Sequence, residues 1–272
     1  MKYLPWIWIV FFLLSAAGTC RGGWVISETN RDNFGNKSSQ STFIQQNQIR
    51  FENASTITIF NLNDSTLTIV FPTLRAYWHG VPAELITGMF DAFEVQLQTL
   101  IVELPYDQQP VYQQMYDSLK VQMRHQDTST ITDRMTLERI DSVMKINQLK
   151  VEGYRIMMDS VIKEEFWMTR DVNPYTEVDI HLFIEMNNKI NPYSRKGTTL
   201  NSLEYINLLS NGLIVKSKKF GQNGHFIETE VDNVKQTPIP IDFFYPPVNY
   251  RKVSLVDVFN LPTIEADDYP DK

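Results

Sequence analysis

The pattern of hydrophobic and polar positions is most regular between Ser41 and Gly80, where β-branched and aromatic residues alternate with polar ones in short runs. Alternation at a period of two predicts strands, and short polar connections predict hairpins. The predicted strands cover residues 43–44, 49–51, 56–60, 66–71 and 76–78. We expect an antiparallel meander, with Ile57 and Ile59 on a core and the intervening threonines on water. Such a sheet needs a cover on its apolar face.

The segment from Pro82 to Gln126 changes to a helical period. Apolar residues recur at spacings of three and four, first over residues 85–104 and then over residues 111–123, with Pro105 between the two runs. This spacing predicts two amphipathic helices, and a proline ends the first. We therefore expect a helical hairpin, with one helix from Pro82 to about Leu104 and the other from about Pro110 to Gln126.

The rest of the chain combines further strands with short helices. A first strand over residues 24–29 precedes a predicted polar loop over residues 30–40. After the hairpin we predict strands over residues 135–140, 143–149, 154–158, 162–168, 213–216 and 226–231. Gly153 and Asp159-Ser160 are predicted breaks, and Gln222-Asn223-Gly224 is a predicted turn. Predicted helical segments cover residues 177–187 and 200–209, the second closed by Gly212, and a short segment over residues 253–259 closes the fold.

This order of elements is an α+β pattern in which one antiparallel sheet is built from both halves of the chain. A domain boundary near Pro105 or Thr128 would leave two incomplete sheets with exposed edges. We therefore predict a single domain over residues 23–262, with a helical insertion over residues 82–126 and an acidic tail over residues 263–272.

The N-terminus has the pattern of a secretory signal peptide. Lys2 supplies the positive charge, Leu4 to Leu14 the apolar run, and Ser15-Ala16-Ala17 a small-residue cleavage site, so residues 1–22 are assigned to it, with cleavage between residues 17 and 22. A membrane anchor is the alternative, but the run is interrupted by Pro5 and is shorter than the roughly 20 residues that span a bilayer. We expect no later stretch to approach that length. We expect an extracytoplasmic, periplasmic protein. Lipidation at Cys20 is a weaker alternative because the residues before it fit a lipoprotein signal poorly.

Composition excludes several classes of function. The 272-residue chain is 43% hydrophobic and carries a formal charge of −7, which favours a folded protein and excludes a general nucleic-acid binder. Its single cysteine allows no intrachain disulfide. The four histidines, His79, His125, His181 and His225, have no paired-ligand spacing, so we expect no metal and no cofactor. Because the chain lacks a nucleophile elbow and a phosphate-binding loop, we expect no enzyme.

The hairpin supplies the candidate ligand-binding residues. The stripe of Phe90, Phe93 and Leu97 on the first helix, with Tyr112 and Met115 on the second, is a candidate wall for a cleft between helix and sheet. Methionine and aromatic side chains adapt well to variable acyl chains. Ordinary core packing of the same stripe against the sheet is the alternative, since apolar helix faces are usually buried.

Several stretches taken together resemble an extracytoplasmic family of unknown function from Bacteroidetes-type bacteria, whose fold is similar to the periplasmic lipoprotein carriers LolA and LolB. The stretches are the signal peptide, the meander from Gln48 to Gly80, residues 151–154 with 164–169, and Pro246 to Tyr250 before residues 253–255. The resemblance covers most of the mature chain. Val248-Asn249 stand where the closing motif usually has a small residue and a glycine. The resemblance implies an incomplete, half β-barrel covered by helices, with an apolar cleft that holds acyl chains.

These observations lead to a first functional hypothesis and two alternatives. The first is a non-enzymatic envelope protein that binds a lipid or the acyl chain of a lipoprotein in a cleft between sheet and helices. The second is an interaction module with a filled core, whose hairpin docks another envelope protein. An enzyme whose site forms only in three dimensions is third.

Overall fold

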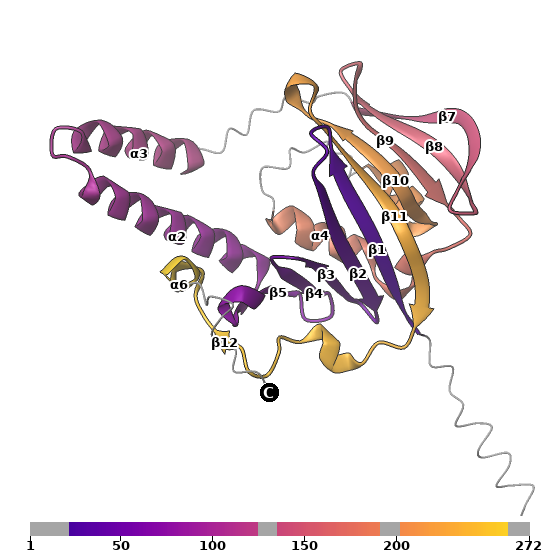
Figure 1. Ribbon diagram of the computed structural model, residues 1–272, viewed down its shortest axis with the longest axis horizontal. Coiled ribbons are helices and arrows are strands. Elements are labelled where there is room, and N and C mark those ends of the chain that lie inside the picture. Colours follow the sequence, from indigo (N-terminus) through magenta and orange to yellow (C-terminus); the bar gives the residue numbers. More distant parts are fainter. Residues whose placement is uncertain (1–21, 125–134, 191–201, 261–272) are drawn as a thin grey trace, which may run out of the picture.

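The structure is a computed structural model that describes residues 22–124, 135–190 and 202–260, and one large curved sheet dominates it (Figure 1). Its twelve strands lie in the order β12-β6-β5-β4-β3-β2-β1-β11-β10-β9-β8-β7. The strands are β1 (Gly23–Asp32), β2 (Lys37–Gln45), β3 (Gln48–Asn53), β4 (Ile57–Asn61), β5 (Thr66–Phe71), β6 (Ala76–Gly80), β7 (Met135–Ile146), β8 (Leu149–Met158), β9 (Val161–Thr169), β10 (Leu213–Phe220), β11 (Phe226–Thr237) and β12 (Arg251–Lys252). Neighbouring strands are antiparallel except β12 and β6. The predicted α+β class with an unclosed, curved antiparallel sheet is confirmed.

Two meanders meet at the centre of this sheet. Strands β1 to β6 form the first, β7 to β11 form the second, and β1 pairs with β11 along its whole length, from Gly23 opposite Thr237 to Asp32 opposite Ile227. The two halves of the chain therefore share one sheet, as their incomplete edges predict.

The helical elements lie on one face of the sheet or project from its side (Figure 1). The α-helices are α2 (Pro82–Glu103), α3 (Gln109–Arg124), α4 (Ile180–Ile190), α5 (Leu203–Ser210) and α6 (Leu255–Asn260), and a 3₁₀ turn, η2 (Pro174–Glu177), precedes α4. Asp179 caps α4, accepting hydrogen bonds from the backbone N–H groups of His181 and Leu182 at 3.0 and 3.1 Å. Helices α4 and α5 bury Ile180, Ile184 and Ile206 against the aromatic and apolar side chains of β8 and β9.

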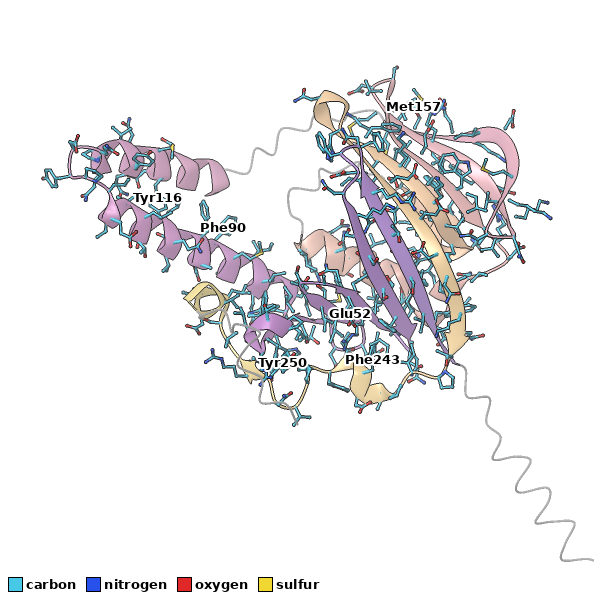
Figure 2. The ribbon with its side chains drawn as sticks, viewed as in Figure 1. Glu52, Phe90, Tyr116, Met157, Phe243 and Tyr250 are labelled. Atoms are coloured by element: carbon cyan, nitrogen blue, oxygen red, sulfur yellow. The ribbon has the colours of Figure 1, made fainter. Side chains whose placement is uncertain are left out.

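The opposite face of the first meander is also covered. Ile57, Ile59 and Val70 pack there against Ile239 and Phe244 of the C-terminal segment. Arg50, on the same face, donates a 2.7 Å hydrogen bond from its guanidinium to the Phe243 carbonyl and lies 4.0 Å from the centroid of that ring. Glu52 and Phe243 accordingly lie close together at this end of the sheet (Figure 2).

The α2–α3 hairpin projects away from the sheet (Figure 1). The base of α2 is held by α6 and α4, where Leu85 is buried in the main core. Farther out, Tyr116 of α3 packs towards α2 and donates a hydrogen bond to the carboxylate of Glu94 (Figure 2). The expectation that no stretch after the N-terminus approaches the length of a membrane span is wrong, because by length and composition alone α2 is long and apolar enough to cross a membrane, and most of it is not buried.

Several predicted boundaries are wrong. Residues 30–40 are not a loop, because β1 continues to Asp32 and β2 begins at Lys37. The face of β4 that carries Thr58 does not lie on water as predicted, because Phe60, which points to the same side two residues later, is buried in the main core. The predicted break at Gly153 lies inside β8 and the turn is instead at Asn147-Gln148, where both residues have positive φ. The two predicted strands of residues 135–149 are therefore a single strand, β7, with a bulge between Ile140 and Val143.

Residues 1–21 and 261–272, with the predicted signal peptide and the acidic tail, lie outside the described residues.

Gly212 has a different role from the predicted helix cap. It follows Asn211, the C-cap residue of α5, in the predicted position, but it does not have the positive φ of a left-handed helix cap. At Gly212 an added Cβ would lie 2.2 Å from the carbonyl oxygen of Thr169 in β9, a distance that no real Cβ contact reaches. Glycine is therefore required at this position because the backbone of β9 passes so close to it.

We expect Gly212→Ala to lower the free energy of unfolding by about 1–3 kcal/mol, because the overlap can be relieved only by backbone movement. Gly221→Ala is the matched control, since its Cβ would meet no atom nearer than 3.5 Å, and we expect a change within about 0.5 kcal/mol. Urea unfolding of both variants measures the difference. Equal stability of the two variants would contradict the close approach at Gly212.

Candidate functional site

A cavity of about 370 Å³ lies on the concave face of the sheet, where the two meanders meet. Strands β1, β2, β3, β9, β10 and β11 form its walls, and η2, α4 and α5 cover it through Tyr175, Phe183 and Tyr205. This volume is in the range of about 300–1,000 Å³ that is typical of small-molecule sites.

The cover is tied to the sheet by Asn47 at the turn between β2 and β3. Its backbone N–H donates to the Glu177 carbonyl at 2.8 Å, and its side-chain oxygen accepts a 2.7 Å hydrogen bond from the backbone N–H of Asp179. Asn47 has a φ of 62°, which asparagine tolerates better than most residues. These bonds hold η2 and the start of α4 against the sheet.

The walls change from apolar to polar in the same direction on every central strand. Along the inner face of β1 the order is Ile26, Glu28 and Asn30. The paired strand β2 runs from Ile44 through Thr42 to Gln40, and β10 runs from Val215 through Ser217 to Lys219. One end, called the apolar end, is lined by Ile26, Ile44, Ile49, Phe51, Phe183 and Val231. The other, called the polar end, is lined by Glu28, Asn30, Gln40, Glu164, Lys219 and Thr229.

A bulge in β11 brings its residues into these walls. Ser27 pairs with Asn233 but Glu28 pairs with Val231, so Asp232 is the extra residue. Because side chains alternate along a strand, this single extra residue turns Val231 and Thr229 to the same face as Val234. The hydroxyl of Thr229 then donates a 2.6 Å hydrogen bond to the side-chain oxygen of Asn30, within the polar end.

Burial perturbs the acid groups of the cavity. It raises the pKa of Glu28, an effect that Lys219 opposes and Asp232 reinforces. Burial also raises the pKa of Glu164, again opposed by Lys219, which pairs with Glu164 across β9 and β10. The pKa of Tyr175 is raised to about 12 by burial and by the charge of Glu28. Ionisable groups with such shifts inside a cavity are typical of functional sites.

The five residues predicted from the sequence as a cleft wall lie outside the concave cavity. Phe90, Phe93 and Leu97 are on α2, and Tyr112 and Met115 are on α3, and none of the five lines the concave cavity. The hairpin does bring the two helices together, but Phe93, Tyr112 and Met115 remain exposed. Their binding of a ligand stays a prediction.

Sequence reasoning missed the residues that do line the cavity. The available signal was the alternation of Ile26, Glu28 and Asn30, which places a carboxylate on the same face as a core isoleucine. A similar alternation joins Gln40, Thr42 and Ile44, a segment that the sequence assigned partly to a loop. No group of three or more metal-binding side chains occurs among residues 22–124, 135–190 and 202–260.

Comparisons with known proteins give little further information. No family model and no curated protein matches the chain. Among solved structures, one match is entitled "Structure of PNGF-II in C2 space group", with 10% identity and a TM-score of 0.38; it covers 88% of this chain but 32% of that chain. Another is the LolA superfamily protein NE2245 from Nitrosomonas europaea, with 5% identity and a TM-score of 0.28, covering 83% of this chain and 90% of that one. Both identities are below 25% and both TM-scores are below 0.5, so neither match supports a conclusion about function.

Proposed function

We propose that this protein is a non-enzymatic, extracytoplasmic binding protein of the cell envelope that holds the apolar chain of a lipid or of an acylated protein in the concave cavity. The observation that carries the proposal is the cavity itself, whose apolar end has isoleucine, valine and phenylalanine walls from β1, β2, β3, β11 and α4. Removal of apolar surface from water would drive binding, at about 25 cal/mol per Å² before ordering costs.

Two sequence features support the proposed location in the cell envelope and the proposed acyl ligand. The N-terminal pattern of Lys2, an apolar run and Ser15-Ala16-Ala17 favours export, and the resemblance to an extracytoplasmic family with a lipoprotein-carrier fold favours an acyl ligand. Both observations are independent of the cavity. Export also makes envelope lipids and lipoproteins the apolar molecules that the protein meets.

Native mass spectrometry of the protein purified gently from its own envelope tests the proposal directly. We expect a stoichiometric apolar ligand, which extraction and mass analysis would identify. A clean ligand-free mass that does not change after incubation with envelope lipids would contradict the proposal.

We expect Thr229→Trp to block the cavity, because this side chain lies on its floor and an indole would occupy the space of the ligand. Binding of dodecanol, measured by displacement of a fluorescent apolar probe, should fall by at least about tenfold, the equivalent of ~1.4 kcal/mol. Asn233→Trp is the matched control, because Asn233 lies on the same strand, is exposed and does not line the cavity. Equal loss of binding in both variants, or in neither, would contradict the assignment of the cavity.

A second candidate function is docking through the α2–α3 hairpin, either to an apolar ligand or to another envelope protein. The observation that favours it is a set of exposed apolar side chains on the projecting helices, among them Met89, Phe93, Leu100, Tyr112 and Met115. Large apolar side chains that are exposed on one element often mark an interaction site. In this case the cavity would be part of the scaffold.

Phe93→Asp separates the two candidates. Phe93 is 40% exposed, so we expect the variant to remain folded and to keep its affinity for dodecanol if the cavity is the binding site. Leu85→Asp is the contrasting control, because Leu85 is 3% exposed and a buried charge there should unfold the domain. Circular dichroism and probe displacement are the measurements. A folded Phe93→Asp protein that no longer binds dodecanol would favour the hairpin instead.

A further inference from the structure

The polar end of the cavity contains two carboxylates that the protein itself does not neutralise by contact. Glu28 lies on β1 and Glu164 on β9, and both are half-buried in the cavity wall. Within the described segments, neither carboxylate accepts a hydrogen bond or forms an ion pair. Burying a charged group without a partner destabilises a fold, so such groups are retained where a ligand supplies the partner.

The hydroxyl of Tyr205 provides a second, independent indication. This side chain of α5 is only 7% exposed and lines the same cavity, and in the part of the chain that the structure describes its hydroxyl has no hydrogen-bond partner. The hydroxyl itself is not fully buried, so it is open to the cavity, where water or a ligand can pair with it. The polar end therefore presents unsatisfied oxygens to whatever occupies it.

The charge balance of the polar end decides which head group fits. Two lysines, Lys216 and Lys219, also line the cavity. The ammonium group of Lys216 is already paired, at 3.2 Å from Glu228 and 3.3 Å from Glu230. The two carboxylates are therefore opposed by the ammonium group of Lys219, which is exposed and so lies at the rim. The amide groups of Asn30 and Gln40 carry no charge and can donate or accept, and the Asn30 oxygen already accepts the hydrogen bond from Thr229, so these side chains leave the charge balance unchanged. This end of the cavity therefore favours a donor that carries positive charge.

We propose that the ligand is a single-chain amphiphile with a primary ammonium head group, which Glu28 and Glu164 bind at the polar end while the chain lies in the apolar end. This inference rests on the proposed function, since it assigns the head group of the same ligand. A lipid or an acylated peptide can each supply this chemistry, and the mass of the extracted ligand distinguishes the two sources.

The binding of such a ligand depends on pH. Because the pKa of each carboxyl is raised by burial, protonation removes the negative charge at a higher pH than for an ordinary glutamate. The groups that face Glu28 are Lys219, Asp232 and Tyr175, and those that face Glu164 are Lys219 and Tyr205. Ammonium binding requires the ionised carboxylates, so affinity is present above the raised pKa values and is lost as the pH falls through them.

The experiment compares dodecylamine, dodecanol and dodecanoate, each below its critical micelle concentration, by displacement of a fluorescent apolar probe. We expect dodecylamine to bind tightest and dodecanoate weakest. Glu28→Gln and Glu164→Gln should each weaken dodecylamine by about tenfold, the scale of one charge-assisted hydrogen bond, and weaken the uncharged dodecanol much less. Lys219→Gln should strengthen dodecylamine, which no loss of fold would produce.

Two controls test whether dodecylamine binding depends on these two carboxylates rather than on the overall negative charge, and whether the variants remain folded. Glu185→Gln removes an exposed carboxylate of α4 that pairs with Lys189, and neither residue lines the cavity, so dodecylamine binding should not change. Glu28→Gln and Glu164→Gln should raise the Tm of the ligand-free protein at neutral pH. This gain should disappear below the ordinary glutamate pKa of about 4.3, because a raised folded-state pKa costs stability only where the group is ionised.

The outcomes distinguish this inference from the proposed function. Equal binding of dodecylamine and dodecanol, with no effect of Glu28→Gln, Glu164→Gln or Lys219→Gln, would overturn the head-group assignment and leave the apolar cavity in place. Tighter binding of dodecanoate would overturn it as well. Failure of all three probes to bind the wild-type protein would instead contradict the proposed function.

Discussion

The pairing of β1 with β11 is the interaction on which the rest of this structure depends. It joins Gly23 to Thr237 and continues to the far end of both strands, so the first and last strands of the two meanders become neighbours. Closing a loop of this length costs chain entropy, although the cost grows only slowly with loop length. Without this pairing each meander would expose an unpaired edge, and the concave cavity, which has walls from both, would not exist.

The bulge at Asp232 determines which side chains of β11 line the cavity. The extra residue shifts the register of β11 by one. Val231 and Thr229 therefore face the same side of the sheet as Ile26, Glu28 and Asn30, the concave side. A register of this kind is specified because one face is buried, and a slip of one residue would exchange the two faces. The same central strands therefore supply both the apolar packing and the polar end of the cavity.

The sheet is covered on both faces. On the concave side, Asn47 holds η2 and α4 through hydrogen bonds of 2.8 and 2.7 Å. On the outer side, the C-terminal segment packs over Ile57 and Ile59, with Arg50 bonded to the Phe243 carbonyl. The projecting hairpin is held at the base of α2, where Leu85 joins the core and where α6 and α4 pack against the helix.

The sequence by itself determined the local elements and their class. Period-two alternation located β3 to β6, three- and four-residue spacing located α2 and α3, and the order of elements predicted one antiparallel sheet from both halves of the chain. The position of the site was decided only by tertiary structure. The apolar stripe of Phe93 and Met115 has the same sequence pattern whether it packs on a sheet or projects into solvent, because periodicity identifies a face but not its partner. Glu28 and Glu164 are 136 positions apart in the numbering of the chain, and only the pairing of β1, β11, β10 and β9 places them around one cavity.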